Sequence, residues 1–292
     1  MHSQPSVLFL ITPTAQNTSD NWQCIPQAFE SFGWTVSRDL HDNIYQGDTL
    51  LTSSGREVAS YDLVWPIGFG PLATFADRCS LLSQLPSRKL ITAIPALQNL
   101  HAKNRWLKYG PPALVSKHKI QLKEFTQRHQ GTWVLKTNAG SFGKDVYFLA
   151  NPEEIDQFIP DNSDQYWVLQ QRVGSTTSDY CETRVLICGE EIVGCYQRST
   201  QSNGLANLSQ QGQAQSAELS DIEQTLVQRV MADFAKFDIG FASIDIAEDF
   251  LIETNIANPG GLSTLQQVYG DAYYRRACAQ LVKGAHSFVQ NG

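Results

Sequence analysis

The chain has 292 residues, of which 42% are hydrophobic and 17% charged, and its net charge is -7 at pH 7. A chain of this length and apolar content can bury a large core, which argues against a disordered or fibrous protein. The acidic balance and the lack of any basic run argue against a nucleic-acid-binding surface, because phosphate neutralisation needs clustered Lys and Arg.

Signals for metal binding by cysteine, for secretion and for membrane insertion are lacking. The six cysteines are scattered without CxxC spacing, which argues against a zinc site and a disulfide framework. The N-terminus has no basic n-region, and no apolar stretch approaches the roughly 20 residues that cross a bilayer. We therefore expect a soluble, cytoplasmic protein that binds neither nucleic acid nor membrane.

Short apolar segments alternate with helical patterns over the first 99 residues. The segments comprise residues 7–11, 34–36, 61–65 and 89–94. This alternation is typical of a small α/β unit with a mostly parallel sheet. The loops at residues 12–16 and 68–73 would lie at the ends of that sheet, where open α/β sheets usually bind ligands.

Residues 99–109 are predicted to form a helix that contains Lys103. Residues 131–149 follow as a strand that ends at Lys136, a small-residue loop and a second strand. Glycines in such a loop let backbone N–H groups approach a phosphate chain, and lysines add positive charge. A Walker A loop is excluded because GxxxxGK[ST] is absent and no helix follows directly. A tight hairpin without a ligand fits the pattern equally well.

Residues 182–198 are predicted to form a hairpin with Arg184 on its first strand and Arg198 at the end of its second. The two arginines either solubilise the surface or clamp a carboxylate or phosphoryl group. The uncharged polar segment 199–215, with Asn207 in its middle, is either a functional loop or a linker. A capping box of the S-x-x-E type at residues 220–223 then opens an amphipathic helix.

The most informative stretch is residues 240–261, which read as two apolar strands joined by an acidic turn. Asp245 lies on the first strand, and Glu253 and Asn255 lie two apart on the second, so the latter two share a face. Pairing of the strands as a hairpin would bring Asp245 to that face. Two carboxylates and an amide suit Mg²⁺, which usually takes one or two carboxylates and completes its octahedron with water and phosphate. A solvated polar strand face would show the same spacing.

The order of these features resembles the ATP-grasp superfamily, most closely its glutathione synthetase-like and ribosomal-protein glutamate ligase-like carboxylate–amine ligases. The resemblance runs from about residue 100 to residue 265. Its strongest parts are the Asp245, Glu253-x-Asn255 pattern with the Pro-containing turn that follows, and the Glu182-x-Arg184 strand with its glycine hairpin.

The resemblance implies an α/β (α+β) fold in which a small parallel-sheet domain precedes a two-lobed ATP-grasp domain with antiparallel sheets. The implied boundaries are 1–99 for the N-terminal domain, 100–170 for the small lobe and 171–292 for the catalytic lobe. Relatives are often dimers or tetramers, which leaves a homo-oligomer open.

The resemblance also implies roles for individual residues, with ATP and Mg²⁺ as the cofactors. The implied ATP ligands are Lys103, Lys136, Ser141, Phe142, Gly143, Gln170, Gln171 and Val173. The implied ligands of two Mg²⁺ ions, which Mn²⁺ could replace, are Asp245, Glu253 and Asn255. Arg184, with Arg198 and Asn207, would stabilise an acyl phosphate. Asn258, Gly260 and Gly261 would lie near the acceptor amine.

The chain departs from the glutathione-making members at two places near the substrates. Its loop at residues 138–144 contains fewer glycines, and Leu205-Ala206-Asn207-Leu208 stands where those members have Arg-Gly-Asn-Leu. The resemblance therefore implies the chemistry, an amide-forming ligase that uses small carboxylate and amine substrates, but leaves their identity open. A ligase that extends a protein or peptide tail and a non-catalytic ATP-binding protein are the alternatives.

Overall fold

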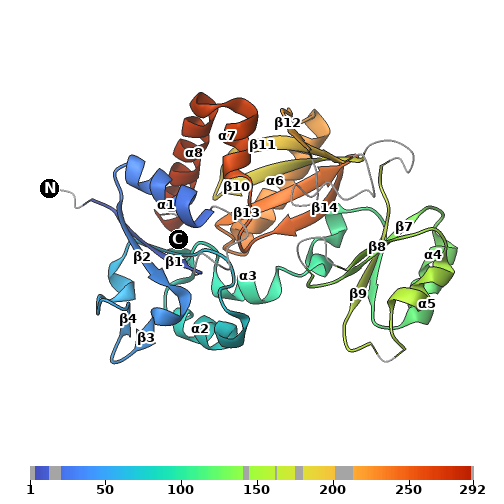
Figure 1. The fold of residues 1–292 in the computed structure, drawn as a ribbon, viewed down its shortest axis with the longest axis horizontal. Coiled ribbons are helices and arrows are strands. Elements are labelled where there is room, and N and C mark those ends of the chain that lie inside the picture. Colours follow the sequence, from blue (N-terminus) through green and yellow to red (C-terminus); the bar gives the residue numbers. More distant parts are fainter. Residues whose placement is uncertain are drawn as a thin grey trace.

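The computed structural model describes residues 4–12, 21–140, 145–161, 163–174, 180–200 and 213–290. Within these ranges the strands form a three-stranded, a four-stranded and a five-stranded sheet and a small two-stranded ribbon. The three-stranded and four-stranded sheets lie at opposite ends of the molecule, and the five-stranded sheet lies between them (Figure 1). The combination of parallel and antiparallel sheets confirms the predicted fold class.

The three-stranded sheet is parallel, in the order β2-β1-β5, and both of its faces are covered. Its strands are β1 (Ser6–Ile11), β2 (Thr35–Leu40) and β5 (Leu63–Pro66). Alternate β1 side chains pack on opposite faces: Phe9 on α1 (Asn21–Ser31), and Leu10 on α2 (Phe75–Leu82) and α3 (Ile94–Asn99). Burial on both faces explains why β1 reads as a continuous apolar run. The ribbon pairs β3 (Tyr45–Gln46) with β4 (Leu50–Leu51).

The apolar segment 89–94 does not continue this sheet as a strand. Its Leu90 forms a single parallel bridge with Val64, and Ile94 already begins α3. Pro95 follows in the first turn of α3. Backbone N–H groups in a first turn have no helical acceptor, so a proline there costs no helical hydrogen bond.

The four-stranded sheet is antiparallel, in the order β6-β9-β7-β8. Its strands are β6 (Ala113–Ser116), β7 (Trp133–Thr137), β8 (Val146–Leu149) and β9 (Trp167–Gln171). Helices α4 (Lys119–Arg128) and α5 (Ile155–Phe158) cover one face. All members of the core between them lie within residues 114–169. This sheet therefore has a hydrophobic core of its own.

The five-stranded sheet is antiparallel, in the order β12-β11-β10-β13-β14. Its strands are β10 (Tyr180–Cys188), β11 (Glu191–Thr200), β12 (Gln213–Gln215), β13 (Phe241–Ala247) and β14 (Phe250–Asn255). Helix α6 (Asp221–Lys236) covers one face, and α7 (Leu262–Tyr269) and α8 (Asp271–Gln290) pack on the other. The predicted capping box at the start of α6 is confirmed, since Ser220 and Glu223 hydrogen-bond each other's backbone N–H.

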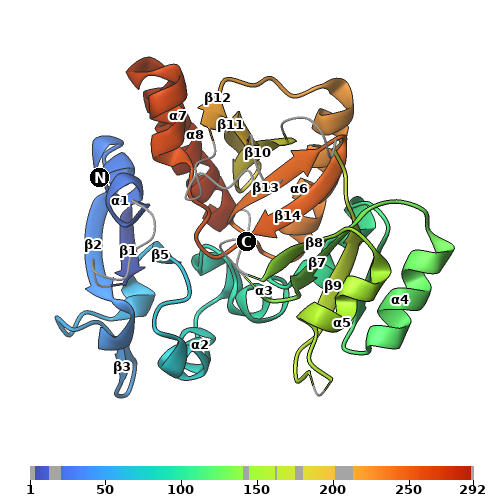
Figure 2. The same cartoon turned by 45° about the vertical axis from the view of Figure 1, so that its right-hand side comes forward.

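The parallel sheet and the five-stranded sheet share one continuous core. Helix α8 lies between them (Figure 2), and the rings of Trp65 on β5 and Phe241 on β13 are 5.2 Å apart between centroids. Residues before β6 also belong to the larger body, because Leu100 and Trp106 pack in the α6 core. The implied domain boundaries stay a prediction.

The predicted helix over residues 99–109 is wrong. Helix α3 ends at Asn99, and two short 3-10 turns follow, η6 (Lys103–Arg105) and η7 (Leu107–Tyr109). Asn138 is the physical reason. Its carbonyl accepts from the Lys103 N–H at 3.0 Å and its Oδ1 from the Asn104 N–H at 3.0 Å, so these donors are directed away from a helix.

No helix among the described residues combines the length and apolarity needed to cross a membrane.

Candidate functional site

The β13–β14 hairpin brings the three predicted metal ligands to one face. Asp245 pairs directly with Glu253, and Asn255 lies opposite Ser243. The turn between the strands places Glu248 and Asp249 at φ of 46° and 66°, the left-handed geometry of a two-residue hairpin turn. The predicted hairpin and its acidic turn are therefore confirmed.

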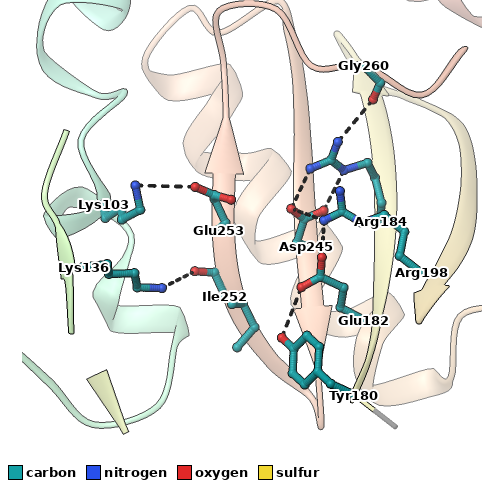
Figure 3. A network of polar contacts seen from close by, with 10 residues as sticks. All are labelled: Lys103, Lys136, Tyr180, Glu182, Arg184, Arg198, Asp245, Ile252, Glu253 and Gly260. Carbon is teal, nitrogen blue, oxygen red and sulfur yellow. Dashed lines mark hydrogen bonds and ion pairs between the residues drawn. The ribbon is translucent and has the colours of Figure 1, made fainter. Parts of the chain in front are cut away.

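Arg184 and Arg198 meet at the Asp245 carboxylate (Figure 3). Arg184 lies opposite Asp245 in the β10–β13 ladder, and its Nε and Nη2 each donate to one carboxylate oxygen at 2.7 Å. Arg198 comes from β11, and its Nη2 lies 2.8 Å from Asp245 Oδ2. Burial alone would raise the pKa of Asp245, but the two guanidinium groups hold it below its usual value.

A second carboxylate, Glu182, stands behind this pair. Glu182 lies opposite Arg198 in the β10–β11 ladder, and Arg198 Nη2 donates to its Oε1. The Tyr180 hydroxyl donates to its Oε2 at 3.1 Å. Residues 180, 182 and 184 alternate along β10, so the three side chains share a face. The sequence analysis named Glu182 only as part of the Glu182-x-Arg184 pattern and gave it no role. It missed Tyr180, although the two-residue spacing along β10 places Tyr180 on the same face as Glu182.

A small pocket lies between the four-stranded sheet and β14. Its lining residues are Lys103, Trp106, Leu107, Lys136, Gln170, Leu251, Ile252, Glu253 and Thr254. Lys103 Nζ lies 3.5 Å from Glu253 Oε1, and Lys136 Nζ lies 3.5 Å from the Ile252 carbonyl oxygen. Burial lowers the pKa of Lys136 to about 8. Two cationic groups thus face an acidic strand across a partly apolar cavity.

Three of the implied ATP ligands, Gln170, Gln171 and Val173, lie at or just beyond the end of β9, and their side chains point in different directions. Gln170 is buried and lines the pocket, whereas Gln171 turns away and its Nε2 donates to the Gln130 carbonyl at 2.9 Å. Val173 packs against a small cluster that includes Tyr180 and Ile252. The structure therefore brings the side chain of Gln170, but not that of Gln171, to the pocket.

The remaining expected loop residues, namely Ser141, Phe142, Gly143 and Asn207, lie outside the described residues.

The donor chemistry of the hairpin fits Mg²⁺, although its oxygens have protein partners in this structure. Asp245 accepts from both arginines, and Asn255 Oδ1 accepts from the backbone N–H groups of Ala257 and Asn258 at 3.2 and 3.3 Å. Within the described ranges no three His, Cys, Asp or Glu side chains converge on one point. Two carboxylates and an amide nevertheless match an ion that takes few protein ligands.

The turn expected near the acceptor amine contacts helix α1, which packs on the parallel sheet. Asn21, fully buried at the start of α1, donates from Nδ2 to Asn258 Oδ1 at 2.7 Å and to the Pro259 carbonyl at 2.8 Å. The Gly260 carbonyl lies 3.5 Å from Arg184 Nη1. Gly261 has a φ of 138°, and a Cβ there would come within 2.8 Å of the Tyr196 hydroxyl. Sequence reasoning missed Asn21, because nothing local reveals a partner more than 230 residues away.

Comparison with known proteins gives consistent matches. Residues 100–270 match the family model of the prokaryotic glutathione synthetase ATP-grasp domain. The glutathione synthetase of Anaplasma centrale is 28% identical over 173 residues, which cover 58% of this chain and 55% of that enzyme. The glutathione synthetase of Thermosynechococcus vestitus is 24% identical over 236 residues, which cover 77% and 74%. The match thus spans little more than half the length of the first of these curated relatives.

Among solved structures, the ATP-grasp ligase PsnB complexed with minimal precursor has the same fold. It superposes with a TM-score of 0.70 at 14% identity, covering 96% of this chain and 98% of that chain.

Proposed function

Because the chain belongs to the prokaryotic glutathione synthetase ATP-grasp family, we propose that it is an ATP- and Mg²⁺-dependent ligase that joins a carboxylate to an amine. Its substrates would be small amino acids or peptides. The supporting observation is the arrangement across the pocket, where Lys103 and Lys136 face the strand that carries Glu253. Lysines opposite an acidic strand suit a nucleotide whose phosphates bind the lysines and whose metal binds the acids.

The reaction we propose has two steps. A substrate carboxylate oxygen attacks the γ-phosphorus of ATP, which forms an acyl phosphate and releases ADP. The acceptor amine then attacks the acyl carbon, the C–O bond to phosphate breaks, and an amide, phosphate and a proton result. The first step joins two anions, so the protein must supply cations and alignment rather than a nucleophile.

Each charged residue would have a distinct task in these steps. Lys103 and Lys136 would bind the ATP phosphates, and Arg184 and Arg198 would neutralise the acyl phosphate. Asp245, Glu253 and Asn255 would hold Mg²⁺, which when bound neutralises charge on the transferring phosphoryl group. Two ions and replacement by Mn²⁺ belong to the same proposal.

A ligase that acts on a peptide or protein tail is the second candidate, because PsnB, which shares the fold over nearly the whole chain, is complexed with a minimal precursor. A non-catalytic ATP-binding protein is less well supported. Such a protein has no need for two arginines and two carboxylates buried beside the nucleotide pocket.

The deciding experiment measures ADP release with ATP and Mg²⁺ against a panel of amino acids and short γ-glutamyl peptides. Glu253→Gln removes a proposed metal ligand, and Glu248→Gln, an exposed turn residue of the same hairpin, is the matched control. Turnover that requires both a carboxylate and an amine, survives in Glu248→Gln and is lost in Glu253→Gln supports the ligase. ATP binding without turnover for any panel member would refute small-substrate ligation and favour a peptide acceptor or a binding protein.

A further inference from the structure

Two buried polar groups behind Asp245 have no task in the proposed chemistry, namely the Glu182 carboxylate and the Tyr180 hydroxyl. We propose that Glu182 is a positioning residue, which together with Tyr180 fixes the guanidinium group of Arg198 and aims it at the transferred phosphoryl group. This inference rests on the proposed function, because it concerns the reacting centre of the ligase.

Glu182 is held from both sides. Its Oε1 accepts from Arg198 Nη2, and its Oε2 accepts from the Tyr180 hydroxyl at 3.1 Å. The same Nη2 lies 2.8 Å from Asp245 Oδ2, so the guanidinium group bridges two carboxylates. A planar group bound by acceptors on two strands has little freedom to rotate. The side-chain direction of Arg198 therefore depends on Glu182 as well as on Asp245.

The charges of this cluster balance only when Glu182 is ionised. Arg184 and Arg198 supply two positive charges, and Asp245 and Glu182 supply two negative ones, all on buried or nearly buried side chains. A neutral residue at position 182 would leave Arg198 with Asp245 as its single carboxylate partner. Because buried charges are tolerated only when paired, Arg198 would then shift toward Asp245 or toward solvent.

Arg198 also presents an unused donor, which distinguishes it from an ordinary structural ion pair. Its Nε is buried and has no hydrogen-bond partner within the described ranges. An unpaired buried donor is unfavourable, and an anionic ligand oxygen would satisfy it. Because Nη2 is fixed by two carboxylates, the direction of Nε is fixed as well.

Direct contact of Glu182 with the nucleotide is the competing explanation. The geometry does not favour it, because both carboxylate oxygens of Glu182 are already engaged by Arg198 and Tyr180. Glu182 is also absent from the residues that line the pocket, to which Lys103, Lys136 and Glu253 contribute.

A double-mutant cycle tests the inference, using Glu182→Gln, Arg198→Gln and the double variant of the full chain. The readouts are kcat for ADP release, the Kd for ADP, and the melting temperature. If Glu182 acts through Arg198, both single variants lose kcat by about tenfold or more, and the double variant is no worse than Arg198→Gln. The Kd for ADP changes less than about threefold, since ADP lacks the transferred phosphoryl group and neither residue would touch it.

Tyr180→Phe is the conservative variant, because it keeps the ring in place and removes only the hydroxyl. We expect a smaller loss of kcat, about two- to fivefold, that disappears in the Glu182→Gln background. Losses that multiply in the double variant, or a Glu182→Gln protein that binds ADP as weakly as Lys136→Met, would overturn the inference. A wild-type protein that turns over no substrate would refute the proposed function instead, so the two failures are distinguishable.

Discussion

Arg184 lies directly opposite Asp245 in the β10–β13 ladder and covers both of its carboxylate oxygens with 2.7 Å hydrogen bonds. The carboxylate that is proposed to bind Mg²⁺ is thus already paired with a guanidinium group. A metal ion bound to Asp245 would lie close to the positive guanidinium group of Arg184, so metal and arginine compete electrostatically for this carboxylate.

This competition gives the first prediction, for Arg184→Gln. We expect the variant to bind Mn²⁺ about tenfold more tightly than wild type in the presence of ADP, because Asp245 has lost its bidentate partner. Ligation should fall at the same time. Electron paramagnetic resonance of free Mn²⁺ measures the affinity, and Arg38→Gln, which breaks an exposed pair with Glu30, is the control. Weaker Mn²⁺ binding in Arg184→Gln would show that Asp245 is not released for the metal.

The second prediction concerns pH and nucleotide binding. Burial lowers the pKa of Lys136 to about 8, so the free protein loses this positive charge as the pH rises through that value. Only protonated Lys136 attracts phosphate, and therefore the affinity for ADP should fall by up to about tenfold per pH unit above pH 8. Calorimetric titration with ADP between pH 7 and pH 9.5 measures this affinity.

Lys136→Met is the control for this pH effect. It should bind ADP weakly, with a flat profile over the same range. If the affinity of the wild-type protein for ADP did not change between pH 7 and pH 9.5, Lys136 would not be a phosphate ligand.

The third prediction is that Gly261→Ala lowers the stability of the folded protein. The residue has a φ of 138°, and its Cβ would lie 2.8 Å from the Tyr196 hydroxyl and 2.9 Å from Leu186. Backbone strain and the clash together should lower the free energy of unfolding by roughly 2–4 kcal/mol. Gly55→Ala is the matched control, because Gly55 also has positive φ, 80°, but open space around its Cβ position. Urea unfolding should show a clearly smaller loss of unfolding free energy for Gly55→Ala than for Gly261→Ala.

The fourth prediction concerns Asn21, whose amide holds the turn at Asn258 and Pro259. Asn21→Ala should raise the KM for the acceptor amine several-fold, because the turn loses its anchor on α1, whereas the Kd for ADP should stay unchanged. Steady-state kinetics with each substrate varied in turn separate the two effects. Asn43→Ala, which removes a hydrogen bond to Asp39 on β2, is the control. Equal effects in both variants would indicate a general loss of stability.

The β13–β14 hairpin could be predicted from the sequence because its information is local. Alternation with period two and the acidic two-residue turn indicate two paired strands. The pairing of Asp245 with Glu253 also requires a register shift between Asp245 and Ile246, which the sequence does not reveal. The capping box of α6 is local in the same sense. The fold class followed from the family resemblance together with these patterns.

Features that depend on distant partners could not be predicted in this way. The helix expected at residues 99–109 fails because Asn138, more than 30 residues away, takes its backbone donors. The engagement of Asp245 by Arg184 requires β10 to lie beside β13, which no spacing in the sequence reveals. The outward direction of Gln171 depends on the pleat of β9 and the Gln130 carbonyl, and so on the register of the whole sheet.

The separate core of the four-stranded sheet has a consequence for the two pocket lysines. Lys136 lies on β7, within a sheet whose apolar contacts are its own, whereas Lys103 precedes Trp106, which is packed into the α6 core. The η6 turn is nonetheless tied to the end of β7, because Asn138 accepts from the Lys103 and Asn104 N–H groups. A hinge rotation of the four-stranded sheet would therefore move both pocket lysines relative to β14. The contact of Asn21 with Asn258 joins α1 to the turn after β14, outside the four-stranded sheet, so this rotation would not change it. A rotation that opens the pocket would thus leave the turn at Asn258 and Pro259 unchanged.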